Sequence, residues 1–421
     1  MFRCSRLAAA LVLLLPVVVS AQVDAYGRDA SDGRQLPPLQ RAVPAPAAAS
    51  SEPATFVLLP YSTHATVSNA DAIALGDVTG DGRPDVVATT TWFFDGENDD
   101  HVFVFPQGED GTLRPPGKLP YGQRNPTRTG LALGNFDGQG ALDVAIGAFG
   151  VTQLHASAAP PWLTYAGFAA EAATTVTRID LDGAGRDDFV VLSWWSGGTR
   201  FIANAAGGYD ALPWDVFVSG YNSIATGDLD GDGIDDIVSA SGQGKLPNVN
   251  VTRNNHDGTL TDLGYLDARC DVWFARGVGI GDFNGDGNND IVASAGGNTP
   301  TSCLLLFLGS GNGQFAAPQT LPSYDIPEAL AVADIDLDGR DDVLVLHGGW
   351  AALGVYRQRA DGTLAPEQLF EIPYTSHYNP QGLVVGDFTG DGRPDVAFAG
   401  GGWGVVTLAN ATDAIFADRF D

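Results

Sequence analysis

The sequence predicts an all-β fold, a seven-bladed β-propeller of four-stranded antiparallel blades, and two observations lead to this prediction. The first is a nine-residue acidic loop that recurs seven times, while the second is the set of short apolar runs around each copy. We number the loops 1–7 in chain order; they begin, 45 to 58 residues apart, at Asp77, Asn135, Asp180, Asp228, Asp282, Asp334 and Asp387. Repeats of this length are typical of proteins in which each unit buries its apolar face against its neighbours.

Each repeat contains four runs with the pattern of β-strands. One run leads into the loop, and a second run with β-branched residues, such as Ile237-Val238, leaves it. The third and fourth runs are joined by a turn that contains glycine, as at Asp110-Gly111. Short apolar runs bounded by turn residues favour antiparallel β-structure. Four strands in each of seven repeats is the pattern of a propeller.

The two ends of the repeat region predict how the ring closes. Residues 56–64 resemble residues 369–377, but they precede loop 1 and lack three strands of their own. The last repeat ends near Leu408 and lacks a fourth strand. We therefore expect the N-terminal segment 55–60 to complete the last blade, because this pairing removes exposed sheet edges.

The segments outside the propeller, which we place at 55–410, have simpler compositions. Residues 1–21 have the form of a secretory signal peptide, in which Arg3 and Arg6 precede an apolar stretch and a cleavage site at Ala21. Residues 22–54 have the alanine- and proline-rich composition of a linker, and 411–421 form a C-terminal tail. We expect a monomer that is secreted, extracellular or periplasmic, without membrane insertion.

The acidic loop has the chemistry of a calcium site. Ca²⁺ takes six to eight oxygen ligands at about 2.3–2.6 Å, whereas Mg²⁺ prefers a smaller octahedral shell. Oxygen-bearing side chains at positions 1, 3, 5 and 9, a carbonyl at position 7 and a glycine turn at position 6 suit Ca²⁺. We expect about five to seven Ca²⁺ ions at such loops. The predicted ligand positions are Asp77, Thr79, Asp81, Arg83, Asp85, Asn135, Asp137, Asp143, Asp180, Asp182, Asp188, Asp228, Asp230, Asp232, Ile234, Asp236, Asp282, Asn284, Asp286, Asn288, Asp290, Asp334, Asp336, Asp338, Arg340, Asp342, Asp387, Thr389, Asp391, Arg393 and Asp395.

The loops differ in their carboxylates, and two alternatives to a calcium loop exist. Loops 4 and 6 carry four carboxylates and are expected to bind best, whereas Gln139 in loop 2 and Ala184 in loop 3 replace the acid at position 5. An EF-hand is excluded because it needs glutamate at position 12 and flanking helices, and position 12 of loop 1 is Ala88. A turn held only by side-chain hydrogen bonds is the alternative for any single copy. Seven regularly spaced copies favour metal binding.

Composition limits the partners and predicts a disulfide. The chain of 421 residues has a formal net charge of −29, and 22 of its 51 acidic residues occupy predicted ligand positions. Nucleic acids and anionic membranes require basic surfaces, so neither is expected as a partner. Cys270 and Cys303 follow the signal peptide, and we expect them to pair in an oxidising compartment. Two buried thiols are the alternative.

The loop and the strand that follows it, as in Gly227-Asp-Leu-Asp-Gly-Asp-Gly-Ile-Asp-Asp-Ile-Val238, resemble the FG-GAP/VCBS repeat. This repeat builds the integrin α-chain propeller and many bacterial secreted proteins. The resemblance implies a propeller with calcium loops on one face and ligands on the opposite face. It leaves the function open, because the family includes adhesins, lectins, scaffolds and polysaccharide lyases.

The loops expected on the opposite face are rich in aromatic side chains beside hydrogen-bonding groups. This combination suits sugar rings, which present apolar C–H patches and fixed hydroxyls. The candidate ligand-binding residues are Trp92, Trp194, Trp195, Trp350, Trp403, Tyr61, Tyr121 and Tyr374. Packing between blades is the alternative for each of them.

Three functions remain open from the sequence. We expect a binding or interaction module for a glycan or a protein. The alternative is an extracellular polysaccharide lyase or hydrolase, for which Tyr374, His377 and Arg124 are a candidate set, although no catalytic residue is assigned. A lyase needs a base and a cation that offsets the substrate carboxylate. A scaffold without a small ligand is the third reading.

Overall fold

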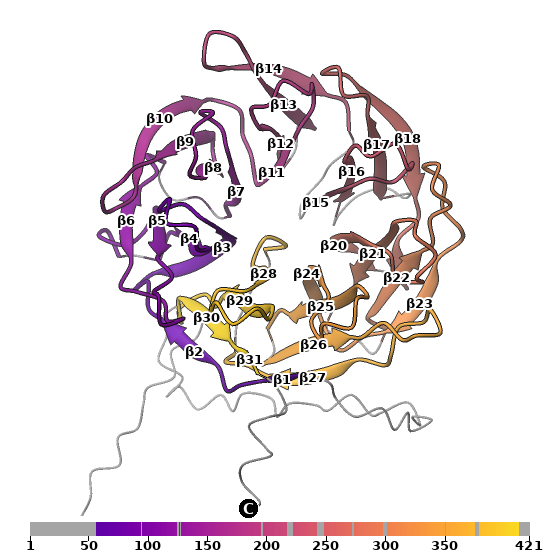
Figure 1. Ribbon diagram of the computed structural model, residues 1–421. Coiled ribbons are helices and arrows are strands. Elements are labelled where there is room, and N and C mark those ends of the chain that lie inside the picture. The colour runs from indigo at the N-terminus through magenta and orange to yellow at the C-terminus, as the bar shows by residue number, and fades with distance from the viewer. Residues whose placement is uncertain are drawn as a thin grey trace, which may run out of the picture.

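The computed structural model describes residues 56–411, apart from 94, 124–125, 127, 195–196, 217–221, 242–247, 272, 298–300, 350 and 375–378. Every regular element assigned in the described residues is a β-strand. Apart from the two-stranded pair β1 (Val57–Leu58) and β31 (Asn410–Ala411), the strands form seven antiparallel sheets arranged in a ring around a central axis (Figure 1). The predicted all-β, seven-bladed propeller is confirmed. The predicted signal peptide, the linker and nearly all of the tail lie outside the described residues.

Each blade contains four strands, which we give from the innermost to the outermost. Blades 1 to 4 consist of β3 (Asn69–Gly76), β4 (Asp85–Thr91), β5 (His101–Phe105) and β6 (Gly117–Pro120); β7 (Gly130–Gly134), β8 (Asp143–Gly147), β9 (Val151–Ala156) and β10 (Leu163–Ala169); β11 (Thr175–Ile179), β12 (Asp188–Leu192), β13 (Gly198–Ala203) and β14 (Tyr209–Trp214); and β15 (Asn222–Gly227), β16 (Asp236–Ser241), β17 (Val249–Asn254) and β18 (Leu260–Leu266). Blades 5 to 7 consist of β20 (Trp273–Gly281), β21 (Asp290–Ala295), β22 (Cys303–Phe307) and β23 (Gln319–Pro322), with β19 (Arg269–Cys270) added beside β20; β24 (Pro327–Ala333), β25 (Asp342–His347), β26 (Ala352–Tyr356) and β27 (Gln368–Glu371); and β28 (Leu383–Gly386), β29 (Asp395–Ala399), β30 (Val405–Leu408) and β2 (Ser62–His64).

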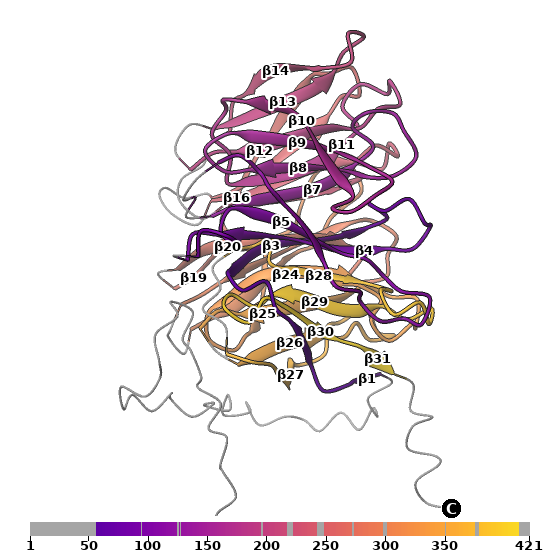
Figure 2. The ribbon, with the colours of Figure 1, turned by 90° about the vertical axis from the view of Figure 1, so that its left-hand side faces the viewer.

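The apolar core is divided among the junctions between blades. Seven clusters of buried side chains each join two neighbouring blades, and together they run around the whole ring. The junction of blades 1 and 2, for example, contains Val87, Val144 and Ile146, all fully buried. Both faces of each second strand are therefore covered, as the side view of the stacked blades shows (Figure 2). After their first aspartate, the second strands accordingly consist mostly of apolar and small residues, although β4 also buries Thr89–Thr91.

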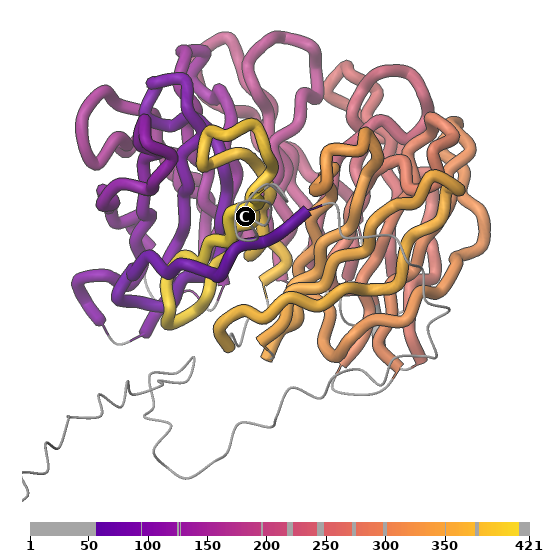
Figure 3. Tube along the Cα trace, turned by 60° about the horizontal axis from the view of Figure 1, so that its bottom comes forward, coloured from indigo at the N-terminus to yellow at the C-terminus, as the bar shows by residue number. Residues whose placement is uncertain are grey.

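The N-terminal segment lies along the C-terminal strands and supplies the outer strand of blade 7. Ser62–His64 pairs with β30, whereas β1 (Val57–Leu58) pairs with β31 (Asn410–Ala411) beyond the blade (Figure 3). The blade strand therefore lies a few residues after the predicted segment 55–60. The described part of this segment is antiparallel to the end of the chain, so Val57–Leu58 extends the ladder past the end of the blade.

A side chain of blade 7 crosses to blades 2 and 3 at the central axis. The Gln381 amide nitrogen Nε2 donates to the carbonyls of Leu131 (3.0 Å) and Val176 (2.7 Å), and Oε1 accepts from the amides of the same two residues. Gln381 also lines a cavity of about 460 Å³ between the innermost strands. The described residues contain no helix long and apolar enough to cross a membrane.

Candidate metal loops and the opposite face

The acidic loops all occupy the same edge of the ring, which we call the loop face. Each loop connects the first strand of its blade to the second, and position 9 is the first residue of the second strand. In blades 1 and 7, for example, Asp85 and Asp395 lie opposite Gly76 and Gly386, which end the first strands. The turns that join second to third strands consequently lie on the other edge, the opposite face.

The aspartate at position 9 is the structural anchor of each loop. In loop 1, Asp85 Oδ2 accepts from the amides of Val78 (3.0 Å) and Thr79 (2.9 Å), and Oδ1 accepts from the amide of Gln107 (3.1 Å). In each of the other six loops, one oxygen of this carboxylate accepts from a loop amide at position 2 or 3, and the other accepts from an amide at or just after the third strand. One carboxylate thus connects the loop, the second strand and the third strand of its blade.

The seven carboxylates at position 9 are buried without a counter-ion. All are at most 1% exposed, and none forms an ion pair with a described arginine, lysine or histidine. Burial raises the pKa of every one of them. The pKa rises to about 6 at Asp188, Asp236 and Asp290. At Asp342 it rises to about 7. Burying an unpaired charge is unfavourable, so this environment favours a bound cation.

Positions 1, 4 and 6 shape the loop around these carboxylates. In loop 1, Asp77 Oδ1 accepts from the amides of Gly80 (2.7 Å) and Asp81 (3.0 Å), and Oδ2 accepts from the amide of Gly82 (2.8 Å). Both glycines have a positive φ, at 75° and 83°, which side-chain-bearing residues rarely adopt. The glycine pattern of the sequence is therefore a requirement of the turn. Asp81 remains exposed at position 5, where it can reach a cation from the solvent side.

Position 2 carries a residue that the sequence analysis did not single out. Its side chain is apolar and 0–3% exposed in every loop, and it packs in the cluster between its own blade and the next one. These residues are Val78, Phe136, Leu181, Leu229, Phe283, Ile335 and Phe388. The sequence signal for this residue was an apolar side chain at position 2 of every loop, between the polar residues at positions 1 and 3. The buried side chain fixes each loop to a junction between blades.

Loop 6 departs from the glycine pattern, and this departure leads to a prediction. Leu337 stands at position 4 with φ 59° and is half exposed, where the other six loops have glycine. Left-handed backbone disfavours a side chain by roughly 1 kcal/mol. Leu337→Gly is therefore expected to raise the free energy of unfolding by about 0.5–1 kcal/mol in urea denaturation. The control Leu263→Gly, an exposed strand leucine, is expected to lower it. A destabilised Leu337→Gly would show that the side chain makes stabilising contacts.

Arginines from the third strands lie beside two of the position-3 carboxylates. Arg253 is 3.8 Å from Asp230 in loop 4, and Arg357 is 3.4 Å from Asp336 in loop 6. These two loops also bring the carboxylate oxygens at positions 1, 3 and 9 within 4.8 Å of one another, a geometry that could hold a metal ion. The arginines offset one negative charge in each of the two loops that carry four carboxylates.

The predicted aromatic residues have different environments. Trp92 follows the second strand of blade 1 on the opposite face and is 49% exposed. Trp194, Trp403 and Tyr374 are partly buried on the same face, and Trp403 Nε1 donates to the Tyr374 carbonyl at 3.0 Å. Trp195, Trp350, His377 and Arg124 lie outside the described residues.

Two of the predicted ligand-binding residues require correction. Tyr121 is fully buried and its hydroxyl donates to the Thr90 carbonyl at 2.8 Å, so it packs between blades. Burial also raises its pKa well above the usual value. Tyr61 is 42% exposed, but it precedes Ser62, which pairs with Thr407 near the end of the third strand. Tyr61 therefore lies toward the loop face, because the outer strand of blade 7 begins there.

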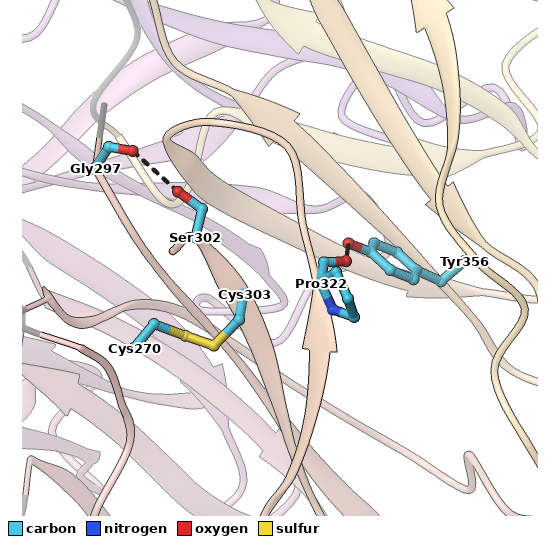
Figure 4. The surroundings of a disulfide bond; sticks show 6 residues. All are labelled: Cys270, Gly297, Ser302, Cys303, Pro322 and Tyr356. Carbon is cyan, nitrogen blue, oxygen red and sulfur yellow. Dashed lines mark hydrogen bonds between the residues drawn. A yellow bond between two sulfur atoms is a disulfide. The ribbon is translucent and has the colours of Figure 1, made fainter. Parts of the chain in front are cut away.

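The two cysteines form a disulfide on the opposite face of blade 5 (Figure 4). Cys270 belongs to β19 and Cys303 is the first residue of β22, with their Cα atoms 6.0 Å apart. Both residues are buried. The bond connects the segment that enters blade 5 to the start of its third strand, which limits the movement of the neighbouring loops on this face.

The repeat pattern matches a known family along more than half of the chain. The model of the FG-GAP-like repeat matches residues 77–146, 228–293, 282–345 and 337–398. The chain belongs to the FG-GAP-like repeat family. The FG-GAP-like matches include loop 2, but they leave out loop 3, whose Ala184 departs from the acidic pattern. No curated protein matches the chain.

Solved structures show the same fold. The FG-GAP-like propeller is similar to an Agrocybe aegerita lectin whose structure concerns specific recognition of non-reducing terminal N-acetylglucosamine, with 19% identity over 82% of this chain and 86% of that chain, at TM-score 0.52. It is also similar to BBS1N, solved in complex with ARL6DN, with 14% identity over 84% and 96% of the two chains, at TM-score 0.53. At these identities the similarity shows the fold alone.

Proposed function

We propose that this protein is a secreted, calcium-stabilised propeller that acts as a binding module. The observation that carries the calcium assignment is the buried carboxylate at position 9, which has no basic partner in the described structure. Each loop with aspartate at position 5 also carries a carboxylate at position 1, and loops 4 and 6 carry a further one at position 3. A hard divalent cation among these oxygens offsets the desolvation of the buried charge.

Calcium is proposed for the five regular loops, 1, 4, 5, 6 and 7, which have aspartate at positions 1, 5 and 9. Position 3 varies among them, with aspartate in loops 4 and 6 and threonine or asparagine in the others. Because Arg253 and Arg357 lie beside the extra carboxylates, the five affinities should be more alike than the carboxylate count suggests.

The ligand is proposed to be a glycan that binds on the opposite face. Trp92 presents a half-exposed indole there, and the buried disulfide orders the start of the third strand of blade 5 on the same face. An exposed aromatic plane beside polar groups suits the C–H face and the hydroxyls of a sugar. The lectin with the same fold supports this choice by analogy only.

Retention on immobilised polysaccharides tests the proposal, with calcium present and chitin-type, cellulose-type and acidic polymers compared. We expect one polymer class to retain the wild-type chain. Trp92→Ala is expected to weaken the affinity about tenfold, because a stacked aromatic side chain contributes roughly 0.5–1.5 kcal/mol or more. Tyr165→Ala is the matched control, since Tyr165 is 60% exposed on the outer strand of blade 2. Failure of every polymer to retain the chain would contradict the glycan assignment.

A further inference from the structure

Two of the seven loops lack the carboxylate at position 5, and both lie beside a histidine. Gln139 occupies this position in loop 2 and Ala184 in loop 3. The structure places His155 next to loop 2 and His256 next to loop 3. The other histidines of the described chain lie away from the loops, so the loss of an acid and the gain of an imidazole coincide.

In loop 2 the histidine comes from the same blade. His155 Nδ1, on the third strand, is 3.8 Å from Asp137 Oδ2. One ligand atom each from Asp137, Asp143 and His155 lies within 4.8 Å of the others. Asn135 Oδ1 at position 1 is buried and has no hydrogen-bond partner among the described residues. In the regular loops the position-1 oxygens accept loop amides, so in loop 2 this oxygen remains available for another partner.

In loop 3 the histidine comes from the next blade. His256 lies in the turn between the third and fourth strands of blade 4, and its Nε2 is 3.3 Å from Asp180 Oδ2. The imidazole packs closely against the loop. Its Cε1 atom is only 3.0 Å from the position that a Cβ atom at Gly183 would occupy. One carboxylate oxygen from each of Asp180, Asp182 and Asp188 lies within 4.8 Å of the others, and His256 is not part of this group. His256 is therefore a hydrogen-bond partner of Asp180 rather than a member of a ligand cluster.

We propose that loop 2 binds a divalent transition metal of the zinc class instead of Ca²⁺, with His155 as the nitrogen ligand and Asp137 and Asp143 as oxygen ligands. Ca²⁺ takes oxygen ligands, whereas an imidazole nitrogen with carboxylates suits Zn²⁺. Two ligand atoms at about 2.0–2.1 Å from a tetrahedral zinc ion are about 3.3 Å apart. The separation between His155 Nδ1 and Asp137 Oδ2 in loop 2, 3.8 Å, is half an ångström longer.

A counter-ion role for His155 is the competing explanation. His155 precedes the residue whose amide binds the position-9 carboxylate, and Arg253 and Arg357 hold the equivalent places in blades 4 and 6. Those arginines lie beside the position-3 carboxylates. An arginine preserves this charge pairing but cannot bind a metal. His155→Arg therefore separates a ligand from a counter-ion.

The experiment uses the full chain, stripped with a chelator and dialysed against excess Ca²⁺, and then titrated with Zn²⁺ by calorimetry. Bound zinc and calcium are counted by elemental mass spectrometry. We expect one zinc ion that excess Ca²⁺ does not displace. His155→Arg should remove it, through a more than tenfold loss of affinity. His256→Gln and His101→Gln, which change histidines outside this cluster, should retain it.

Two results would overturn the proposal: zinc binding that His155→Arg leaves unchanged, or zinc that Ca²⁺ displaces. Cobalt substitution adds a spectroscopic readout, because a nitrogen ligand changes the visible spectrum of Co²⁺ relative to an all-oxygen site. The calcium count in the same samples tests the regular loops separately. Absence of calcium with one zinc ion in place would contradict the calcium assignment and leave the zinc site in loop 2 standing.

Discussion

Removing calcium is expected to lower the melting temperature of this protein by roughly 10 °C or more. In the proposed assignment each regular loop binds the ion only when its blade is folded, so each occupied site would add about 1–3 kcal/mol at ion concentrations ten to a hundred times the dissociation constant. Five sites act on one ring. The effect reaches the blade junctions, because the position-2 side chain of every loop is part of an interblade cluster.

Differential scanning calorimetry in excess chelator and in millimolar CaCl₂ measures this effect, and magnesium in place of calcium is the control. Mg²⁺ is expected to restore only a small part of the stability, because its compact octahedral shell fits these loops less well. An unchanged melting temperature in chelator, with no bound metal by mass spectrometry, would refute the calcium assignment.

The second large effect is expected at position 9. Asp236→Ala should lower the free energy of unfolding by about 2–4 kcal/mol even without calcium, because two buried amides, those of Leu229 and Asn254, lose their acceptor. Asp232→Ala, at the exposed position 5 of the same loop, should lower the free energy of unfolding only when calcium is present. The two variants therefore separate the structural role of the loop from its role in metal binding.

Urea denaturation of both variants, with calcium and with chelator, gives the four free energies required. Gln139→Ala in loop 2 is the control, since Gln139 is exposed and carries no charge, and it should change neither value by more than about 0.5 kcal/mol. If Asp236→Ala and Asp232→Ala were equally stable in chelator, the anchor role of position 9 would be wrong.

The fold was predictable because its signals are local and periodic. The spacing of the loops gave the number of blades, and the apolar runs after them became the second strands, such as Asp188–Leu192. The closing strand is Ser62–His64 and not the predicted segment 55–60. Pairing at the blade edge depends on the register against Val405–Leu408, which sequence similarity between the two ends does not specify.

The candidate sites were predictable only in part. The repeat pattern identified the carboxylates, but His256 reaches loop 3 from another blade and Arg253 reaches loop 4 from the third strand, contacts that no local pattern specifies. The aromatic residues were harder to place. Trp92 and Tyr121 were both predicted to lie on the opposite face, yet one is half exposed and the other is fully buried. Only the packing of neighbouring blades decides between these outcomes.

The ring is closed at two places. The N-terminal strand closes it at the circumference, and the Gln381 side chain connects blades across the axis. The outer closure is the N-terminal strand on blade 7, and the inner one is a single carboxamide that makes four hydrogen bonds to blades 2 and 3. Because the two closures share no residue, fraying of the outer strand leaves blade 7 connected across the ring. The junction where the chain's two ends meet is thus held from inside as well as from outside.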